Sequence, residues 1–151
     1  MSTIVIGIGN LLMTDEGVGV HVARWLTDHR VLPEEVDVLD GGTGGFHLMG
    51  HFQNYDRVIL VDATADGQNP GTITQLQPRY ASDYPQTLTA HDIGLKDLIE
   101  AMYLLDSKPE IILFTISIRM PVDFGVELSA DVAACVPRVA EAVRTYLAAG
   151  G

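Results

Sequence analysis

Cysteine is nearly absent from this sequence of 151 residues, in which Cys135 is the only one. A single cysteine excludes an internal disulfide framework and suits a reducing compartment. No apolar run approaches the roughly 20 residues that a membrane-spanning helix needs, and no basic leader precedes the first apolar run. We therefore expect a cytoplasmic protein that does not enter a membrane.

Basic residues are also scarce, with 9 Lys and Arg against 20 Asp and Glu and a formal net charge of -11. Nucleic acids and anionic membranes both select clustered basic residues, so we expect neither as a partner. The Gly-x-Ser-x-Gly motif of serine hydrolases is missing as well. A hydrophobic content of 47% over this length predicts one folded domain, residues 1–151.

Short apolar runs alternate with helical patterns along most of the chain. The runs predict strands over residues 3–8, 36–39, 57–61 and 110–118. Amphipathic spacing predicts helices over residues 18–26, 46–52, 95–105 and 132–147. This alternation predicts an α/β fold with a mostly parallel sheet covered on both faces, and residues 72–76 as an antiparallel edge strand.

Residues 6–19 form the most informative stretch, Ile-Gly-Ile-Gly-Asn-Leu-Leu-Met-Thr-Asp-Glu-Gly-Val-Gly. It leaves a strand, passes two glycines and delivers two adjacent acids before a helix. A dinucleotide-binding loop would need a third glycine where Leu12 stands, and Asp15 and Glu16 would repel a pyrophosphate. A nucleotide-binding module is therefore the weakest of the functions that we consider.

Carboxylates follow three of the expected strands: Glu16, Asp40 and Asp62. Ligands of an open parallel sheet bind outside the carboxyl ends of its strands, and the helix after His91 should begin at the same rim. Carboxylates and an imidazole can hold a divalent transition metal or exchange protons with a substrate. Taken singly, each is more often a turn former or a helix cap. We expect an exposed rim, where removing a charge alters stability little.

Other histidines and the cysteine give weaker signals. His47 and His51 have the i, i+4 spacing of a helical metal pair. Their segment is short and has no acid between them, so a surface helix is favoured. Cys135 shares a helix side with Val132 and Val139, which favours a place in the core.

Four motifs occur in an order that closely resembles the hydrogenase maturation endopeptidases. They are Gly-Ile-Gly-Asn-Leu-Leu-Met-Thr-Asp-Glu-Gly at residues 7–17, Asp-Gly-Gly-Thr at 40–43, Asp-Ala at 62–63 and His-Asp-Ile-Gly-Leu at 91–95. The resemblance extends from Ile4 to about Leu147 and implies a three-layer α/β/α fold with a five-stranded twisted sheet.

The resemblance also implies a function. Members of the family remove a C-terminal peptide from the large-subunit precursor of a nickel–iron hydrogenase after nickel insertion. Glu16, Asp62 and His91 would contact that nickel, which the substrate supplies, and would be catalytic through it. Asp40 is a further catalytic candidate, and it would line the substrate cleft together with Gly41, Gly42 and Thr43.

The implied enzyme is a nickel-dependent, aspartic-type or metal-directed endopeptidase whose partner is the hydrogenase large-subunit precursor. The nickel could polarise the scissile carbonyl or activate water. An alternative is a non-catalytic adaptor of the same fold that binds the nickel-loaded precursor. We expect the irregular segments 79–89 and 119–126 to carry specificity, because recognition residues concentrate in loops on a rigid scaffold.

Overall fold

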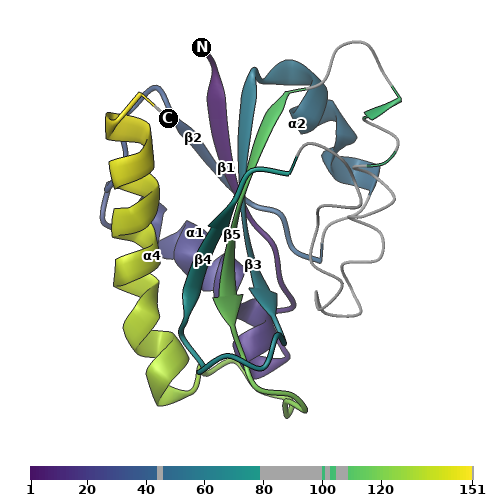
Figure 1. The fold of residues 1–151 in the computed structure, drawn as a ribbon, viewed down its shortest axis with the longest axis vertical. Coiled ribbons are helices and arrows are strands. Elements are labelled where there is room, and N and C mark those ends of the chain that lie inside the picture. Colours follow the sequence, from purple (N-terminus) through teal and green to yellow (C-terminus); the bar gives the residue numbers. More distant parts are fainter. Residues whose placement is uncertain (44–45, 79–99, 101–102, 105–108, 151) are drawn as a thin grey trace.

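A five-stranded mixed sheet forms the centre of the computed structural model, which describes residues 1–43, 46–78, 100, 103–104 and 109–150. The strand order is β2-β1-β3-β5-β4. Neighbouring strands run parallel except at the edge, where β4 is antiparallel to β5 (Figure 1). The strands are β1 (Thr3–Gly7), β2 (Asp37–Asp40), β3 (Arg57–Thr64), β4 (Ile73–Leu76) and β5 (Glu110–Ser117). The expected fold class and its antiparallel edge strand are confirmed.

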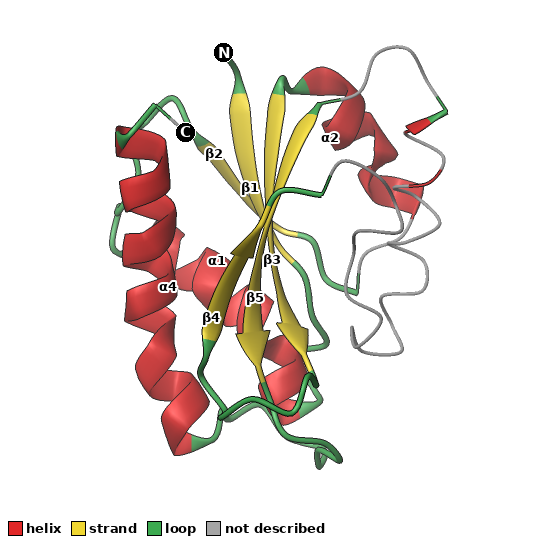
Figure 2. Cartoon of the chain, viewed as in Figure 1, coloured by secondary structure: helices red, strands yellow, loops and turns green. Residues whose placement is uncertain are grey.

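Helices cover both faces of this sheet. α1 (Val18–Asp28) and α4 (Ala130–Ala148) pack together on one face, and α2 (Met49–Asn54) lies on the other (Figure 2). Two short 3-10 helices, η1 (Thr14–Gly17) and η2 (Phe46–Leu48), precede α1 and α2. The helix expected over residues 95–105 falls almost entirely outside the described residues. No described helix has the length and apolar content to cross a membrane.

Side-chain alternation along the strands creates the two cores. Val5, Ile59 and Ile112 pack under α1 and α4. The neighbouring residues in each strand point to the opposite face and pack under α2 with Leu48 and Phe52. The buried strands are therefore apolar on both sides, as the continuous β-branched runs of the sequence predicted.

β3 is longer than the sequence suggested. We expected a strand over residues 57–61 with Asp62 after it, but the ladder to β5 continues through the pairs Asp62–Thr115 and Thr64–Ser117. The reason is that β5 continues beside β3, and its backbone groups remain available for pairing beyond Val61, where the pairing with β1 ends. Asp62 is thus a strand residue and not the first residue of a loop.

Candidate active site

The first glycine-rich loop folds back tightly over the carboxyl end of β1. A Cβ atom on Gly9 would lie 2.4 Å from the carbonyl oxygen of Glu16, so only glycine fits there. The amide of Asn10 donates to that same carbonyl oxygen at 3.2 Å, and the amide of Glu16 donates to the Met13 carbonyl at 3.1 Å. These contacts fix the backbone position of Glu16.

α1 begins directly against the strands. A Cβ atom on Gly19 would lie 2.3 Å from the carbonyl oxygen of Val61, the residue before Asp62. The 3-10 helix η1, which carries Glu16, also contacts β3. The fold therefore brings Glu16 and Asp62 to the same end of the sheet, although 45 positions separate them in the numbering of the chain.

Asp62 is completely buried at this end. It continues the series Val58 and Leu60, so its side chain belongs to the face that α2 covers. Its Oδ1 accepts a hydrogen bond from the amide of Ala63 at 2.8 Å. An aspartate that continues a buried apolar series suggests a functional reason for its charge, because burying a carboxylate is costly.

Three hydroxyl residues that our sequence reasoning missed lie on the same face near Asp62. They are Thr64, Thr115 and Ser117, each at most 2% exposed. Thr115 is the direct neighbour of Asp62 on β5. The available signal was the change from apolar to hydroxyl residues at every second position late in the strand Glu110–Ser117. The carboxyl ends of β3 and β5 thus form a polar floor within an otherwise apolar sheet.

The two adjacent acids of the first motif have different environments. Asp15 accepts hydrogen bonds from the Ser129 amide at 2.8 Å and from Ser129 Oγ at 2.7 Å, so it holds the residue that caps α4. Glu16 is 8% exposed as a residue, and its carboxylate accepts no hydrogen bond from any described residue. Asp15 is therefore engaged in structure, while Glu16 is available for a ligand.

The expectation of an exposed rim is wrong. Glu16 is nearly buried and Asp62 is fully buried. The cause is the close packing of the first loop and η1 over the strand ends, together with the extension of β3. Substituting Glu16 or Asp62 changes a buried side chain, so we expect such substitutions to affect the free energy of unfolding.

The second glycine-rich loop is joined to the first. The Gly41 amide donates to the Gly7 carbonyl at 2.9 Å, and the Gly9 amide donates to the Gly42 carbonyl at 2.7 Å. Asp40 Oδ1 accepts from the Gly42 amide at 3.0 Å and so shapes this turn. Arg24 approaches Asp40 Oδ2 at 3.6 Å, with both side chains about half exposed. These contacts support a structural role for Asp40; its catalytic role stays a prediction, as does a place for Thr43 in a substrate cleft.

His91, the third expected nickel contact, lies outside the described residues. Within the described part of the chain, no three His, Cys, Asp or Glu side chains are close enough to hold a metal ion together, which leaves the set with His91 untested. His47 and His51 belong to no such group.

Cys135 belongs to α4 and is fully buried in the core on the side of that helix that faces the sheet, as predicted. Burial raises the pKa of its thiol to about 11. A thiolate is therefore disfavoured at neutral pH. The thiol also packs on the sheet face opposite to the series that contains Asp62.

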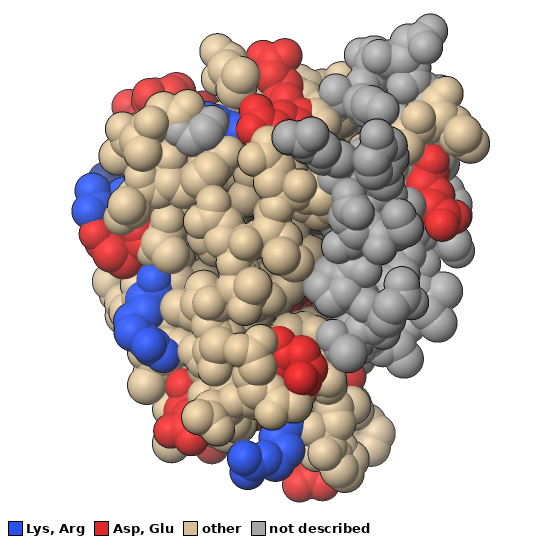
Figure 3. Space-filling view, in the orientation of Figure 1, with Lys and Arg blue, Asp and Glu red and all other residues tan. Residues whose placement is uncertain are grey.

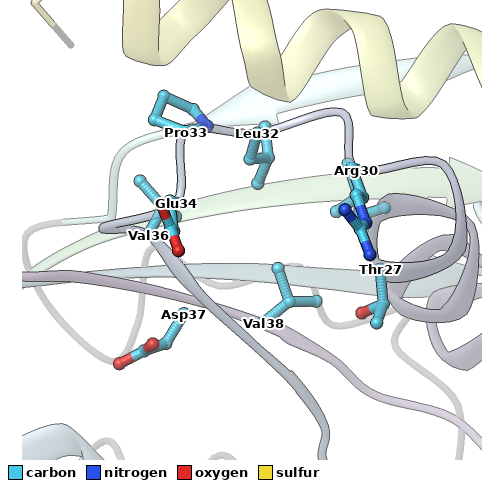
Figure 4. A pocket seen from close by; sticks show the side chains of 9 residues that line it. Thr27, Arg30, Leu32, Pro33, Glu34, Val36, Asp37 and Val38 are labelled. Carbon is cyan, nitrogen blue, oxygen red and sulfur yellow. The ribbon is translucent and has the colours of Figure 1, made fainter.

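A separate hollow of ≈ 580 Å³ lies beside the start of β2, between the end of α1 and residues 30–38 (Figure 4). Asp37 pairs with Ile4 near the beginning of β1, so this hollow is at the amino end of the parallel strands and not at the acid site. On the face shown in Figure 3, the described Lys and Arg side chains stand apart and form no continuous basic patch.

Comparisons with known proteins identify the family of this chain. A family model described as hydrogenase maturation protease matches residues 20–145. The hydrogenase 2 maturation protease of Escherichia coli K12 is 35% identical over 112 residues, which cover 73% of this chain and 68% of that protein. The hydrogenase expression/formation protein HoxM of Azotobacter vinelandii is 31% identical over 153 residues, covering 98% and 73%.

Solved structures show the same fold. The hydrogenase maturating endopeptidase HybD of E. coli superposes with a TM-score of 0.86 at 30% identity, covering 100% of this chain and 94% of that one. The [NiFe] hydrogenase maturation protease HybD of Thermococcus kodakarensis gives 0.79 at 27% identity, covering 97% and 99%. This chain therefore belongs to the hydrogenase maturation protease family.

Proposed function

We propose that this protein is an endopeptidase that removes a C-terminal peptide from the nickel-loaded precursor of a nickel–iron hydrogenase large subunit in the cytoplasm. Membership of the family supports proteolysis of such a precursor. The observation that carries the proposal is the pairing, at one end of the sheet, of a buried Asp62 with a Glu16 that no described residue engages.

The donor chemistry of this site suits the nickel of the substrate. Imidazole suits nickel, and carboxylates add negative charge for a divalent cation; in this proposal Glu16, Asp62 and His91 contact the nickel. Asp15 does not compete, because Ser129 occupies both of its oxygens. When bound, nickel would supply Lewis-acid chemistry, either to the scissile carbonyl or to water.

The protein itself holds the proposed ligands in place and excludes water from Asp62. Interactions of a carboxylate strengthen where water is excluded, and Asp62 is fully buried. The backbone bonds at Asn10 and Met13 hold Glu16 without help from its own side chain. A thiol nucleophile is unsupported, because Cys135 is buried on the other face with a raised pKa.

The test is to incubate the purified protein with a nickel-loaded large-subunit precursor and to follow the precursor by mass spectrometry. We expect one discrete loss of mass, equal to a C-terminal peptide. Stable binding of the precursor with no loss of mass would contradict the proposal and would instead indicate a non-catalytic adaptor.

A further inference from the structure

Three large apolar side chains stand in solvent on two segments that the sequence places far apart. Phe124 is 88% exposed, Leu12 63% and Val126 54%. Met13 and Gly125 form a parallel bridge, which sets Leu12 beside Phe124. We call these three residues the apolar ridge.

The backbone beneath the ridge is firmly held. The Gly125 amide donates to the Leu12 carbonyl, and the Thr14 amide donates to the Gly125 carbonyl, both at 2.8 Å. Thr14 Oγ1 donates to the Asp123 carbonyl at 3.3 Å. The backbone of Val126 also lies close enough to the His21 imidazole to raise its pKa, against the larger effect of burial. Phe124 is thus presented by an anchored segment and not by a free loop tip.

An exposed and ordered phenylalanine calls for an explanation. Hydrating its ring is unfavourable, and contiguous apolar surface on a soluble protein commonly marks a binding site. Bound partners gain most from such a ring when its position is fixed beforehand, because little side-chain and loop freedom is lost.

The ridge adjoins the candidate active site. Leu12 and Glu16 belong to the same tightly bonded loop, in which the Met13 carbonyl accepts the amide of Glu16. A hollow of ≈ 680 Å³ lies alongside, lined by Asp15 and Ser129 as well as by Phe124 and Val126. A polypeptide that reaches Glu16 and Asp62 could therefore lie across the apolar ridge.

Charges around the ridge indicate what kind of segment it would accept. Asp123 and Glu127 flank Phe124 and Val126 and line the same hollow, with Arg119 as a single cation. The whole chain carries a formal net charge of -11. A second copy would bring like charges together across a two-fold contact, whereas an apolar segment with flanking Lys or Arg would be attracted.

We propose that the apolar ridge docks a segment of the hydrogenase large-subunit precursor that presents apolar side chains flanked by basic ones. The ridge sets the affinity for the precursor and leaves the cleavage step unchanged. This inference rests on the proposed function and adds to it the surface that selects the substrate.

Steady-state cleavage of the nickel-loaded precursor tests the ridge. Phe124→Ser should raise KM about 10-fold or more and leave kcat unchanged, because uniform binding is removed. Phe124→Leu should recover most of the affinity. Leu104→Ser is the matched control: its side chain is 87% exposed, it precedes the amino end of β5, and its KM should equal that of the parent.

Two further measurements make the result decisive. In a Glu16→Gln background, titration of uncleaved precursor should show the same loss of affinity for Phe124→Ser, which separates docking from catalysis. If the parent does not cleave at all but the titration still shows this loss, the proposed function fails while the docking surface stands.

An unchanged KM and an unchanged dissociation constant for Phe124→Ser would contradict the proposal that the apolar ridge docks the precursor. Self-association of the parent that Phe124→Ser abolishes in sedimentation would also overturn it, since a second copy would then be the occupant.

Discussion

Asp15 and Glu16 are adjacent acids with the same charge, and hydrogen bonding separates their roles. Asp15 holds the amide and hydroxyl of Ser129. Glu16 accepts nothing from the described residues. A carboxylate that none of the described residues engages can bind a cation, so the second acid is the ligand candidate and the first is an anchor.

Substitutions at these acids should therefore separate stability from processing. Glu16→Gln, Asp62→Asn and His91→Ala should each fold and fail to cleave the precursor, because each removes one proposed nickel contact. Asp15→Ala should instead lower the free energy of unfolding by about 1–3 kcal/mol, since two donors of Ser129 lose their acceptor. Urea denaturation and the cleavage assay measure the two effects. Cleavage at the parent rate by all three variants would contradict the proposal that these residues form one nickel-contacting site.

Gly9 is a second residue whose role can be isolated. Gly9→Ala would place a methyl group 2.4 Å from the Glu16 carbonyl oxygen, and we expect it to cost about 1–3 kcal/mol of stability through overpacking. The control is Gly50→Ala within α2, where no described heavy atom lies within 4 Å of the added carbon. Gly50→Ala should stabilise the protein by about 0.5–1 kcal/mol. Equal urea midpoints for the two variants would contradict the close approach at Gly9.

At the scale of elements, the sequence predicted the strands well because period and composition are local. The run Thr3–Gly7 and the edge strand Ile73–Leu76 both occur where their patterns indicated. The end of β3 was missed, because the continuation past Val61 depends on pairing with β5 and on no local signal. The same holds for Thr115, whose place beside Asp62 is set by register.

The sequence also did not predict the contact of α1 with the segment that follows β5. His21 looked like an ordinary helix residue, yet its ring lies close to the backbone of Val126. Asp15 reaches Ser129 in the same region. Contacts between residues more than a hundred positions apart follow from packing, which no periodicity encodes.

The His21 contact predicts a dependence of stability on pH. Burial, and then the charge of Arg24, lower the pKa of His21 below 6.5, although the Val126 backbone and Asp15 act in the opposite direction. The unfolded chain therefore takes up the proton first as pH falls. The free energy of unfolding should decline below about pH 6.5, and His21→Gln should make that decline shallower. Parallel urea-stability curves for parent and variant between pH 7 and about 5 would refute this.

At the scale of the whole molecule, the two faces of the sheet have different roles. The face under α1 and α4 is mainly apolar and contains Cys135, with Thr3 and Arg57 at the amino end of the strands, so it supplies stability. The other face changes from apolar to polar toward the carboxyl ends of β3 and β5, where Asp62 lies. Docking at the apolar ridge would place a substrate beside this polar end.

The central claim is that the two carboxylates act on a substrate that supplies its own nickel. Metal-stripped protein should be given matched nickel-free and nickel-loaded precursors, and the rate of peptide release measured for each. We expect cleavage of the nickel-loaded precursor alone, with no rescue of the nickel-free one when nickel is added to the protease beforehand. Equal rates on both precursors would contradict the account and leave Glu16 and Asp62 as ordinary acid/base groups.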